Sequence, residues 1–338
     1  MRKICLVGGW TWWHITPLVS IYRYLQNDAE FFWIWEKWWL EEKIAQDNKI
    51  RFFGIKAWKL RRYFSLKTLL EPFNIIAWCF QAYSILKSNR PDVIFSKWWF
   101  VSFPVAVAAS ALKIRLYLHE SDTVPWLANR MVWKFATKVF LGFEDAKMYF
   151  NTIRTEVVGQ ILSPVLFEGI PTKSVSPKTN LIVFAGSQGS KRIFDSILAN
   201  VENLADFDIT IVLWSLNLWF RKDFEKFTNI TCYDFIWPEE IKKLFLEADV
   251  AITRAWATSL AELEAFGIKM IIIPLKESAN NHQYFNALSY KARWEEMLEE
   301  KDMDMLTEVV SKYKGYKKWE IDFKKWGALE VIRREILG

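Results

Sequence analysis

The chain has 338 residues, of which 52% are hydrophobic and 25% are charged, with a formal net charge of +6. Single hydrophobic cores stop growing at roughly 250–300 residues, so two domains are expected. The chain contains no apolar run of about 18 residues, and its N-terminal apolar stretch is too short for a secretory signal. We therefore expect a cytosolic protein. Its 3 cysteines form no CxxC pair, which predicts neither a disulfide framework nor a zinc site.

Short apolar runs alternate with helix-like segments through the first half of the chain. This alternation predicts a parallel sheet covered by helices on both faces. The predicted strands span residues 3–7, 31–34, 51–55, 92–96, 114–119, 138–143 and 155–158. Helices are expected at residues 18–25 and 66–86.

A second series of the same kind follows a stretch containing Pro and Ser, residues 163–180, which is typical of a linker. Its predicted strands span residues 181–185, 208–213, 230–233, 250–253 and 270–274, and a helix is expected at 191–201. Each half opens with a strand, a glycine-containing loop and a helix N-terminus, an arrangement that binds anions. We expect two doubly wound α/β domains, 1–160 and 161–317, and the amphipathic segment 318–338 could pack back on the first. A cleft between the halves is the expected place for a nucleotide and a second substrate.

A basic run, KAWKLRR at residues 56–62, continues at Lys67 and precedes the apolar helix predicted at 66–86. The run is either a solvated loop face or a patch that attracts anionic lipid or nucleic acid, and beside the apolar helix it would suit an anionic membrane surface. Nothing in the sequence resembles a nucleic-acid-binding module. The chain has only 3 histidines, His14, His119 and His282, and each stands at a predicted strand end or loop, where doubly wound sheets bind ligands.

Six segments resemble, in order and spacing, the signatures of glycosyltransferase family 28. They are GGWTWWHITP at 8–17, KWWFVSFP at 97–104, HESDTVPWLAN at 119–129, FAGSQG at 184–189, RAWATSLAE at 254–262 and NHQYFNA at 281–287. The resemblance implies a GT-B fold, in which two Rossmann-like domains face a cleft. It also implies an inverting enzyme at the cytoplasmic face of the cell membrane, which moves N-acetylglucosamine from UDP-GlcNAc to lipid I to form lipid II in peptidoglycan synthesis. No cofactor is implied, and the partners are the two substrates and an anionic membrane surface.

The resemblance also assigns site residues. In the second domain, donor contacts fall to Ser187 and Gln188 at the phosphates, Phe235 and Ile236 at the uracil, Glu262 at the ribose, and His282, Gln283 and Asn286 at the sugar. In the first domain, acceptor contacts fall to Thr11, His14, Ser102, Glu120 and Asn129, and Thr11 is also placed near the donor.

The acceptor hydroxyl needs a base. His14 is favoured because its ordinary pKa is near the working pH, and Glu120 is the competitor. Two DxD strings, 206–208 and 302–304, are not expected to bind a metal. The sequence departs from the family at Leu166, where an arginine is usual, and at Asp122, where an asparagine is usual.

The composition is unusual, with 20 tryptophans and only 12 glycines. An average composition would give roughly 24 glycines in this length. Tryptophan stands at family glycine positions 10, 12, 13, 35, 39, 98, 99, 126 and 256, and further cases are 237 and 294. In a tight loop that needs φ > 0, each tryptophan would cost on the order of 1–3 kcal/mol of folding free energy. A polypeptide that has tryptophan at all these positions should therefore fold poorly or be inactive.

The hypothesis that accounts for this pattern is that UGA, glycine in some bacterial lineages and tryptophan in others, was translated under the wrong code. The version with glycine restored should then transfer N-acetylglucosamine to lipid I, and the tryptophan version should not.

Three alternatives to the lipid I transferase stay open. One is another lipid glycosyltransferase of the same superfamily, such as a diacylglycerol glycosyltransferase. A second is a catalytically dead sugar-nucleotide-binding protein. A nicotinamide dehydrogenase is least favoured, because the first loop lacks GxGxxG spacing and the acidic ribose partner.

Overall fold

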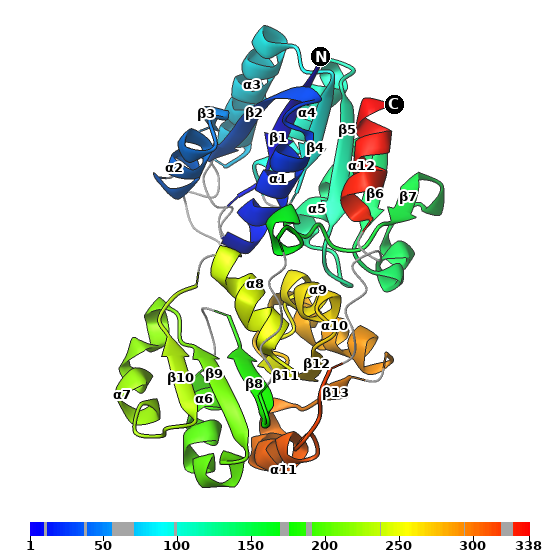
Figure 1. The fold of residues 1–338 in the computed structure, drawn as a ribbon. Helices are drawn as coiled ribbons and strands as arrows, with labels where there is room; N and C mark the ends of the chain where they lie inside the picture. The colour runs from blue at the N-terminus through cyan, green and yellow to red at the C-terminus, as the bar shows by residue number, and fades with distance from the viewer. Residues whose placement is uncertain are drawn as a thin grey trace. The chain divides into compact units, whose positions relative to one another are not determined.

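The structure is a computed structural model that describes residues 1–9, 12–36, 39–55, 71–97, 100–169, 176–186, 191–236, 238–293, 295–318 and 327–338. The chain forms two compact units (Figure 1). The first comprises Met1–Ser163 with Gly327–Gly338, and the second comprises Pro164–Trp326. Within the described residues, no helix is long and apolar enough to span a bilayer.

The first unit contains a seven-stranded parallel sheet in the order β3-β2-β1-β4-β5-β6-β7. Its strands are β1 Arg2–Val7, β2 Ala29–Glu36, β3 Arg51–Ile55, β4 Val93–Ser96, β5 Arg115–Glu120, β6 Lys138–Leu141 and β7 Thr155–Val157. The order reverses between β1 and β4, since β2 and β3 extend the sheet to one side and β4 to β7 to the other. Such a reversal leaves a crevice at the carboxyl ends of the strands.

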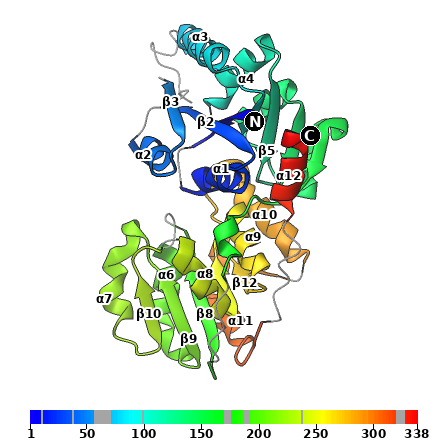
Figure 2. The same cartoon turned by 45° about the horizontal axis from the view of Figure 1, so that its top comes forward.

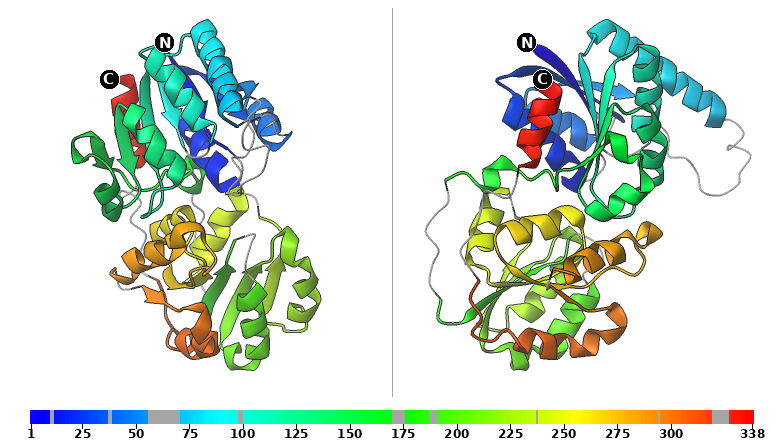
Figure 3. Two further views of the ribbon diagram at one scale, coloured as in Figure 1. Left: turned by 180° about the vertical axis from the view of Figure 1, so that it is seen from behind. Right: turned by 90° about the vertical axis from the view of Figure 1, so that its right-hand side faces the viewer.

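Helices cover both faces of this sheet. They are α1 Trp12–Leu25, α2 Trp39–Asp47, α3 Glu71–Asn89, α4 Ser102–Ala111, α5 Leu127–Val132 and α12 Ala328–Leu337, with 3-10 turns at Trp133–Phe135, Glu144–Tyr149 and Thr152–Arg154. Figure 3 shows α1 and α12 on one face and α3 and α4 on the other. Parallel strands with helices on both faces are buried on both sides, which explains their continuous apolar sequences.

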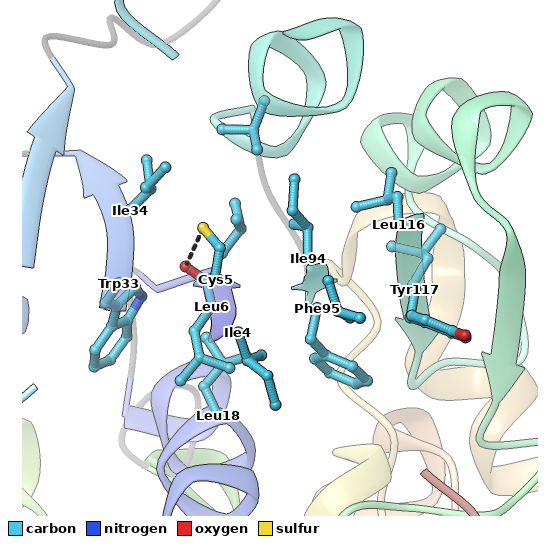
Figure 4. Packing of buried hydrophobic residues seen from close by; sticks show 14 of the residues in the cluster. Ile4, Cys5, Leu6, Leu18, Trp33, Ile34, Ile94, Phe95, Leu116 and Tyr117 are labelled. Carbon is cyan, nitrogen blue, oxygen red and sulfur yellow. Dashed lines mark hydrogen bonds between the residues drawn. The ribbon is translucent and has the colours of Figure 1, made fainter. Parts of the chain in front are cut away.

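The core of the first unit follows from that burial. Ile4, Cys5 and Leu6 are consecutive in β1, and all three have no exposed surface. Figure 4 shows them between residues of β2 and β4, with Leu18 of α1 packed nearby. Every side chain in the middle of β1 therefore contributes to the core.

The last helix of the chain belongs to the first unit. Ile332 and Ile336 of α12 are fully buried in its core. The Tyr117 hydroxyl donates to the Glu335 carbonyl oxygen at 2.9 Å, and Lys138 pairs with the Glu335 carboxylate at 2.8 Å. Figure 2 shows α12, the last helix of the chain, packed beside the sheet of the first unit.

The second unit contains a six-stranded parallel sheet in the order β10-β9-β8-β11-β12-β13. Its strands are β8 Thr179–Phe184, β9 Phe207–Val212, β10 Ile230–Tyr233, β11 Val250–Thr253, β12 Lys269–Ile272 and β13 Glu296–Met297. Its helices are α6 Lys191–Ala199, α7 Arg221–Phe224, α8 Pro238–Glu247, α9 Ala257–Ala265, α10 His282–Lys291 and α11 Leu306–Ser311. Its 3-10 turns are Pro164–Leu166, Val201–Leu204, Ser215–Phe220, Ala279–Asn281 and Glu300–Met305. Residues of α6, α7 and α11 share one core cluster against the sheet.

The predicted fold class, two doubly wound parallel-sheet units, is confirmed, and every predicted strand is present within a few residues. Two differences have physical causes. Helix α1 begins at Trp12, so His14 lies in its first turn and not in the preceding loop. Strand β13 was not predicted, because two residues are too few to show a hydrophobic pattern.

The expectation of strained tryptophans is wrong at the family glycine positions whose backbone is described. Residues 12, 13 and 39 are helical, and residue 35 lies in β2. Trp126 and Trp256 have φ of −66° and −73°. Positions 10, 98, 99, 237 and 294 lie outside the described residues. At the described positions the tryptophans add bulk without backbone strain.

One tryptophan that the motifs did not single out is strained. Trp214, directly after β9, has φ 59° and ψ 163°, a region that almost only glycine adopts. Its side chain is buried, and its ring packs against those of Phe184 and Phe235. The backbone at 214 is therefore that of a glycine.

We predict that residue 214 of the native protein is glycine and that its codon is UGA. Glycine adopts this conformation freely, whereas tryptophan costs about 1–3 kcal/mol. Sequencing the gene identifies the codon, and mass spectrometry of the native peptide that spans residue 214 identifies the residue. Trp33 is the control, because its buried indole donates to the Gly8 carbonyl oxygen at 2.8 Å from within β2, so we expect UGG and a tryptophan mass there. A UGG codon at 214 would contradict the interpretation.

Candidate functional site

The carboxyl ends of three neighbouring strands meet at one edge of the first sheet. β1 pairs Val7 with Ser96 of β4, and the same register continues from β4 into β5. The residues that follow, Gly8, Lys97 and His119, therefore lie near one another at the point where the strand order reverses. A Cβ on Gly8, whose φ is +154°, would lie 2.3 Å from the Lys97 carbonyl oxygen, so only glycine fits this contact.

Glu120 organises the loop that follows β5. The side chain is fully buried, and its carboxylate accepts three N–H donors. The donors are the backbone of Asp122 at 2.9 Å, the backbone of Trp126 at 3.3 Å and the Asn129 side chain at 2.8 Å. One carboxylate therefore fixes three points of the loop and the start of α5.

Lys97 is a further charged residue at this edge, and the sequence analysis did not single it out. Its side chain is 1% exposed, and its Nζ lies 2.6 Å from Ser121 Oγ and 3.2 Å from His119 Nδ1. Burial lowers the pKa of Lys97 to about 8, against the opposing attraction of the Glu120 and Asp122 carboxylates. A lysine directly after the short buried strand VIFS was the signal that could have revealed it.

His119 is held neutral by its surroundings. Burial, and next the Lys97 ammonium, keep the pKa of His119 well below its usual range. Its Nε2 lies 3.0 Å from the Gly159 carbonyl oxygen. His119 therefore has a structural role at the edge of the sheet.

The other residues predicted for the first domain are placed as follows. Thr11 lies outside the described residues, and only the backbone of His14 is described, in α1. Ser102 is buried at the start of α4 and accepts a hydrogen bond from Ser96 Oγ at 2.9 Å. Glu120 and Asn129 are in direct contact.

In the second unit, the ends of β8, β11 and β12 are aligned in the same way. β8 pairs Phe184 with Thr253 of β11, and β11 pairs Thr253 with Ile272 of β12. The Thr253 hydroxyl also donates to the Phe184 carbonyl oxygen at 2.8 Å. The segments after these three strands hold the residues assigned to the phosphates, the ribose and the sugar, whereas those assigned to the uracil follow β10. Gly186, in the first of them, has φ +74°, which a tight loop after a strand requires.

Gln283 of α10 joins two of these loops. Its side-chain oxygen accepts from the backbone N–H groups of Leu275 at 3.0 Å and Ala255 at 3.3 Å. Its side-chain nitrogen is buried and has no hydrogen-bond partner among the described residues. Buried polar groups normally have partners, so this donor indicates a place for a ligand.

Glu262 of α9 shows the same feature with a carboxylate. It is 5% exposed, and its Oε2 has no hydrogen-bond partner among the described residues. Burial raises the pKa of Glu262 to about 8. The group can accept hydrogen bonds from a ligand, at which point ionisation becomes easier.

The remaining donor-side predictions differ in exposure. Asn286 is fully buried and donates to the Ala255 carbonyl oxygen at 3.1 Å, and the buried His282 ring has its Nδ1 2.8 Å from the Ala279 carbonyl oxygen. Phe235 is 44% exposed after β10, whereas Ile236 is buried. Ser187 and Gln188 lie outside the described residues.

An ion-pair network with a buried centre at Arg254 and Glu300 supports the loops after β11 and β12. Arg254, with no exposed surface, contacts Glu300 at 2.6 Å and donates to the Ile273 carbonyl oxygen at 3.1 Å. Arg192 of α6 pairs with the same Glu300 and with Glu277 at 2.9 Å. The network therefore links the helix after β8 to the two other loops.

A pocket of about 580 Å³ opens beside this network. Its lining includes Leu275, Glu277, Asn281, Tyr284 and Glu300. Carboxylates, an amide and a phenol are groups that can hydrogen-bond the hydroxyls of a sugar. The pocket adjoins Gln283 through the backbone of Leu275.

The first DxD string, residues 206–208, has partners within the protein. Asp206 pairs with Lys314 at 2.6 Å, and Asp208 accepts from the Ser176 hydroxyl at 2.8 Å. In the part of the chain that the structure describes, no three His, Cys, Asp or Glu side chains gather around a possible ion. Leu166, at the family's arginine position, is buried.

Two family models match the chain. The glycosyltransferase family 28 N-terminal domain matches residues 4–141, and the family 28 C-terminal domain matches residues 180–318. The two matches cover the edge loops of both sheets.

Curated relatives match over most of the chain. A protein of Clostridium botulinum (strain Alaska E43 / Type E3) is 34% identical over 298 residues, which are 86% of this chain and 82% of the relative. One of Geobacillus kaustophilus is 31% identical over 350 residues, 98% of this chain and 96% of the relative. Both are named UDP-N-acetylglucosamine--N-acetylmuramyl-(pentapeptide) pyrophosphoryl-undecaprenol N-acetylglucosamine transferase.

Solved structures share the fold. MurG of Acinetobacter baumannii has a TM-score of 0.73 at 18% identity and covers 99% of this chain and 95% of its own. The UDP-GlcNAc 2-epimerase of Neisseria meningitidis, bound to UDP-GlcNAc, has a TM-score of 0.67 at 15% identity and covers 100% and 99%. The predicted GT-B fold is confirmed, but a fold shared by a transferase and an epimerase does not decide the chemistry.

Glu262, whose Oε2 has no hydrogen-bond partner among the described residues, should make stability depend on pH. The folded-state pKa of about 8 exceeds the ordinary value of 4.5, so the folded protein keeps a proton that the unfolded chain releases between these values. Stability from this group is therefore full below pH 4.5 and falls as the pH rises to about 8, by up to about 1.4 kcal/mol per unit. In thermal unfolding measured across this pH range, the stability of Glu262→Gln relative to the wild type should increase as the pH rises. Glu264→Gln, on the same helix, is the control, and a parallel trend for all three proteins would refute the assignment.

Proposed function

The chain belongs to glycosyltransferase family 28, and we propose that it transfers N-acetylglucosamine from UDP-GlcNAc to lipid I, the undecaprenyl-pyrophosphoryl-linked N-acetylmuramyl pentapeptide. The observation that carries the proposal is the similarity to transferases of this name over most of both chains. The product is lipid II, the next intermediate in peptidoglycan synthesis.

The second unit holds the donor in this proposal. Glu262 Oε2 and Gln283 Nε2 are buried and without partners among the described residues, and a ribose diol and a sugar hydroxyl would supply the missing hydrogen bonds. Phe235 and Ile236 would lie against the uracil. The GlcNAc ring would enter the pocket beside Leu275, with His282 and Asn286 holding the loops around it.

The diphosphate would lie at the loop after β8. Ser187 and Gln188 follow β8 in the sequence and precede α6, so the N-terminus of that helix would meet the phosphates. Its backbone N–H groups would stabilise the charge that develops on UDP as it leaves, so the transfer needs no cofactor.

The first unit holds the acceptor. We assign the acceptor site to residues 120–129, called the acceptor loop below, together with Thr11, His14 and Ser102. In the transfer the acceptor oxygen bonds to the anomeric carbon, the bond from that carbon to the phosphate oxygen breaks with its electron pair going to UDP, and the configuration inverts.

The base that takes the acceptor proton is His14 in this proposal. The competitor, Glu120, has its carboxylate oxygens engaged by three N–H donors, which suits holding a loop better than accepting a proton. A histidine titrates near neutral pH and can both take and release the proton in each cycle.

The membrane-facing surface would lie on α3 and α5. Ile76 and Phe80, four residues apart on α3, are 54% and 71% exposed, and Leu127 of α5 is 65% exposed. The opposite face of α3 is buried through Ala82 and Leu86. The basic run at 56–62 and Lys67 lie outside the described residues, next to α3 in sequence. Exposed apolar side chains on a helix that follows a basic run in the sequence suit an anionic bilayer surface.

The reaction itself is the first test. Native protein should transfer N-acetylglucosamine from UDP-GlcNAc to lipid I and not to diacylglycerol. Glu262→Ala should weaken UDP binding by about 1–3 kcal/mol in calorimetry, because the ribose hydroxyls lose their partner. Glu264→Ala is the control on the same helix. If the protein transfers N-acetylglucosamine to diacylglycerol and not to lipid I, the acceptor is diacylglycerol. If Glu262→Ala binds UDP with unchanged affinity, Glu262 is not part of the donor site.

The choice of base can be tested separately. His14→Ala should lower kcat by about 10²- to 10⁴-fold, the usual loss when a general base is removed, with little change in the KM for UDP-GlcNAc. The variant should also lose the acid limb of the pH–rate profile. If that limb persists in His14→Ala and disappears in Glu120→Gln, the base is Glu120.

Membrane binding is the third test. The protein should sediment with vesicles that contain anionic lipid, and binding should weaken with added salt, because exposed charges are screened within about 8–10 Å at physiological ionic strength. Ile76→Ser with Phe80→Ser should reduce binding at every salt concentration. Binding that ignores both salt and these substitutions would place the contact elsewhere.

A further inference from the structure

Lys97 is a buried charged residue that contacts neither substrate in the proposed transfer mechanism. It follows β4 at the reversal point of the first sheet, and its backbone N–H donates to the Val7 carbonyl oxygen at 2.8 Å. Its carbonyl oxygen contacts Gly8, so the main chain of Lys97 is held by the end of β1. With 1% of its surface exposed, the side chain is directed into the protein and not toward a ligand.

The ammonium reaches the next strand. Lys97 Nζ contacts Ser121 Oγ at 2.6 Å and His119 Nδ1 at 3.2 Å. The other ring nitrogen of His119, Nε2, lies 3.0 Å from the Gly159 carbonyl oxygen, which can only accept. Nε2 therefore carries the proton, and Nδ1 accepts a hydrogen bond from the ammonium.

The contacts on Ser121 lock the first turn of the acceptor loop. Its hydroxyl meets Lys97, and its carbonyl oxygen accepts from the Gln160 side chain at 2.6 Å. The neighbouring Glu120 then receives its three N–H donors from further along the loop. The loop is thus held from inside by a cation and along its length by an anion.

Charge balance depends on the same lysine. The titratable and charged groups that face its ammonium, among the described residues, are His119, Glu120 and Asp122. Both carboxylates are buried, so removing the cation would leave two buried anions with less compensation.

We propose that Lys97 is a positioning residue of the transferase, which holds Ser121 and the Nε2–H tautomer of His119 and thereby keeps the acceptor loop in place beside the ends of β1 and β4. The inference rests on the proposed assignment of the acceptor loop. Since misplacement by about 1 Å can cost about 100-fold in rate, a buried clamp of this kind has a measurable effect on catalysis.

The decisive variant is Lys97→Met, which keeps the length of the side chain and removes its charge. We expect kcat/KM for lipid I to fall by about 100-fold and the KM for UDP-GlcNAc to stay within about twofold, because the donor lies in the other unit. Lys138→Met is the matched control, since it removes an ion-paired lysine at the opposite end of the same sheet. It should leave both parameters unchanged.

The pH profile separates positioning from packing. In the wild type, kcat/KM for lipid I should fall as the pH rises through about 8, where Lys97 loses its proton. Lys97→Arg keeps the charge at all these pH values, so it should recover much of the activity lost in Lys97→Met and move the alkaline limb upward.

A readout without catalysis is given by the histidine ring nitrogens. The chain has 3 histidines, so ¹⁵N spectra of the unmodified protein can be assigned by replacing them one at a time. His119 should be neutral with its proton on Nε2 from pH 6 to pH 8. A His119 that titrates near 6.5, or that carries its proton on Nδ1, overturns the proposal even if Lys97→Met fails to fold.

The outcomes also distinguish this inference from the acceptor assignment on which it rests. Asn129→Ala leaves Lys97 in place and should raise the KM for lipid I. If Asn129→Ala has no effect, the acceptor assignment fails. If Asn129→Ala is defective while a folded Lys97→Met has normal kinetics for lipid I, the role of Lys97 fails and the acceptor assignment stands.

Discussion

The parallel register of β1, β4 and β5 is the constraint on which the first unit depends, and with it the proposed acceptor site. Because Val7 pairs with Ser96 and the register continues into β5, three loops leave the sheet at one edge. Parallel strands require crossover helices, so residues far apart in sequence meet there. The second unit repeats the arrangement with Phe184 and Thr253. Each substrate is thus assigned to a place where the strand order reverses.

Two buried glutamates, Glu120 and Glu262, show how environment separates roles. Glu120 accepts three N–H donors and has a lysine nearby, so its charge is compensated in the protein alone. Glu262 has an oxygen without a partner among the described residues, and burial raises its pKa to about 8. A satisfied carboxylate holds structure, whereas an unsatisfied one is available to a ligand. The two assignments therefore follow from hydrogen bonding more than from residue type.

The backbone conformation also distinguishes the tryptophans from one another. At positions 126 and 256 the backbone is extended with negative φ, so any residue can adopt it. At position 214 the backbone is one that L-residues avoid. Conformation therefore identifies a glycine site that no motif marks, while the motif positions are identified by their resemblance to a family with glycine there.

The amino-acid sequence by itself determined the order of strands and helices, because buried parallel strands need continuous apolar runs, and the family, because six loop motifs occur in order. It also placed Glu120 and Glu262 in loops or helices at strand ends. Tertiary structure alone decided which of them is satisfied, and it revealed Lys97. Lys97 and His119 are 22 residues apart, and they touch only because β4 and β5 pair in one register. Hydrogen-bond partners and burial are set by segments distant in the chain, so no local pattern can encode them.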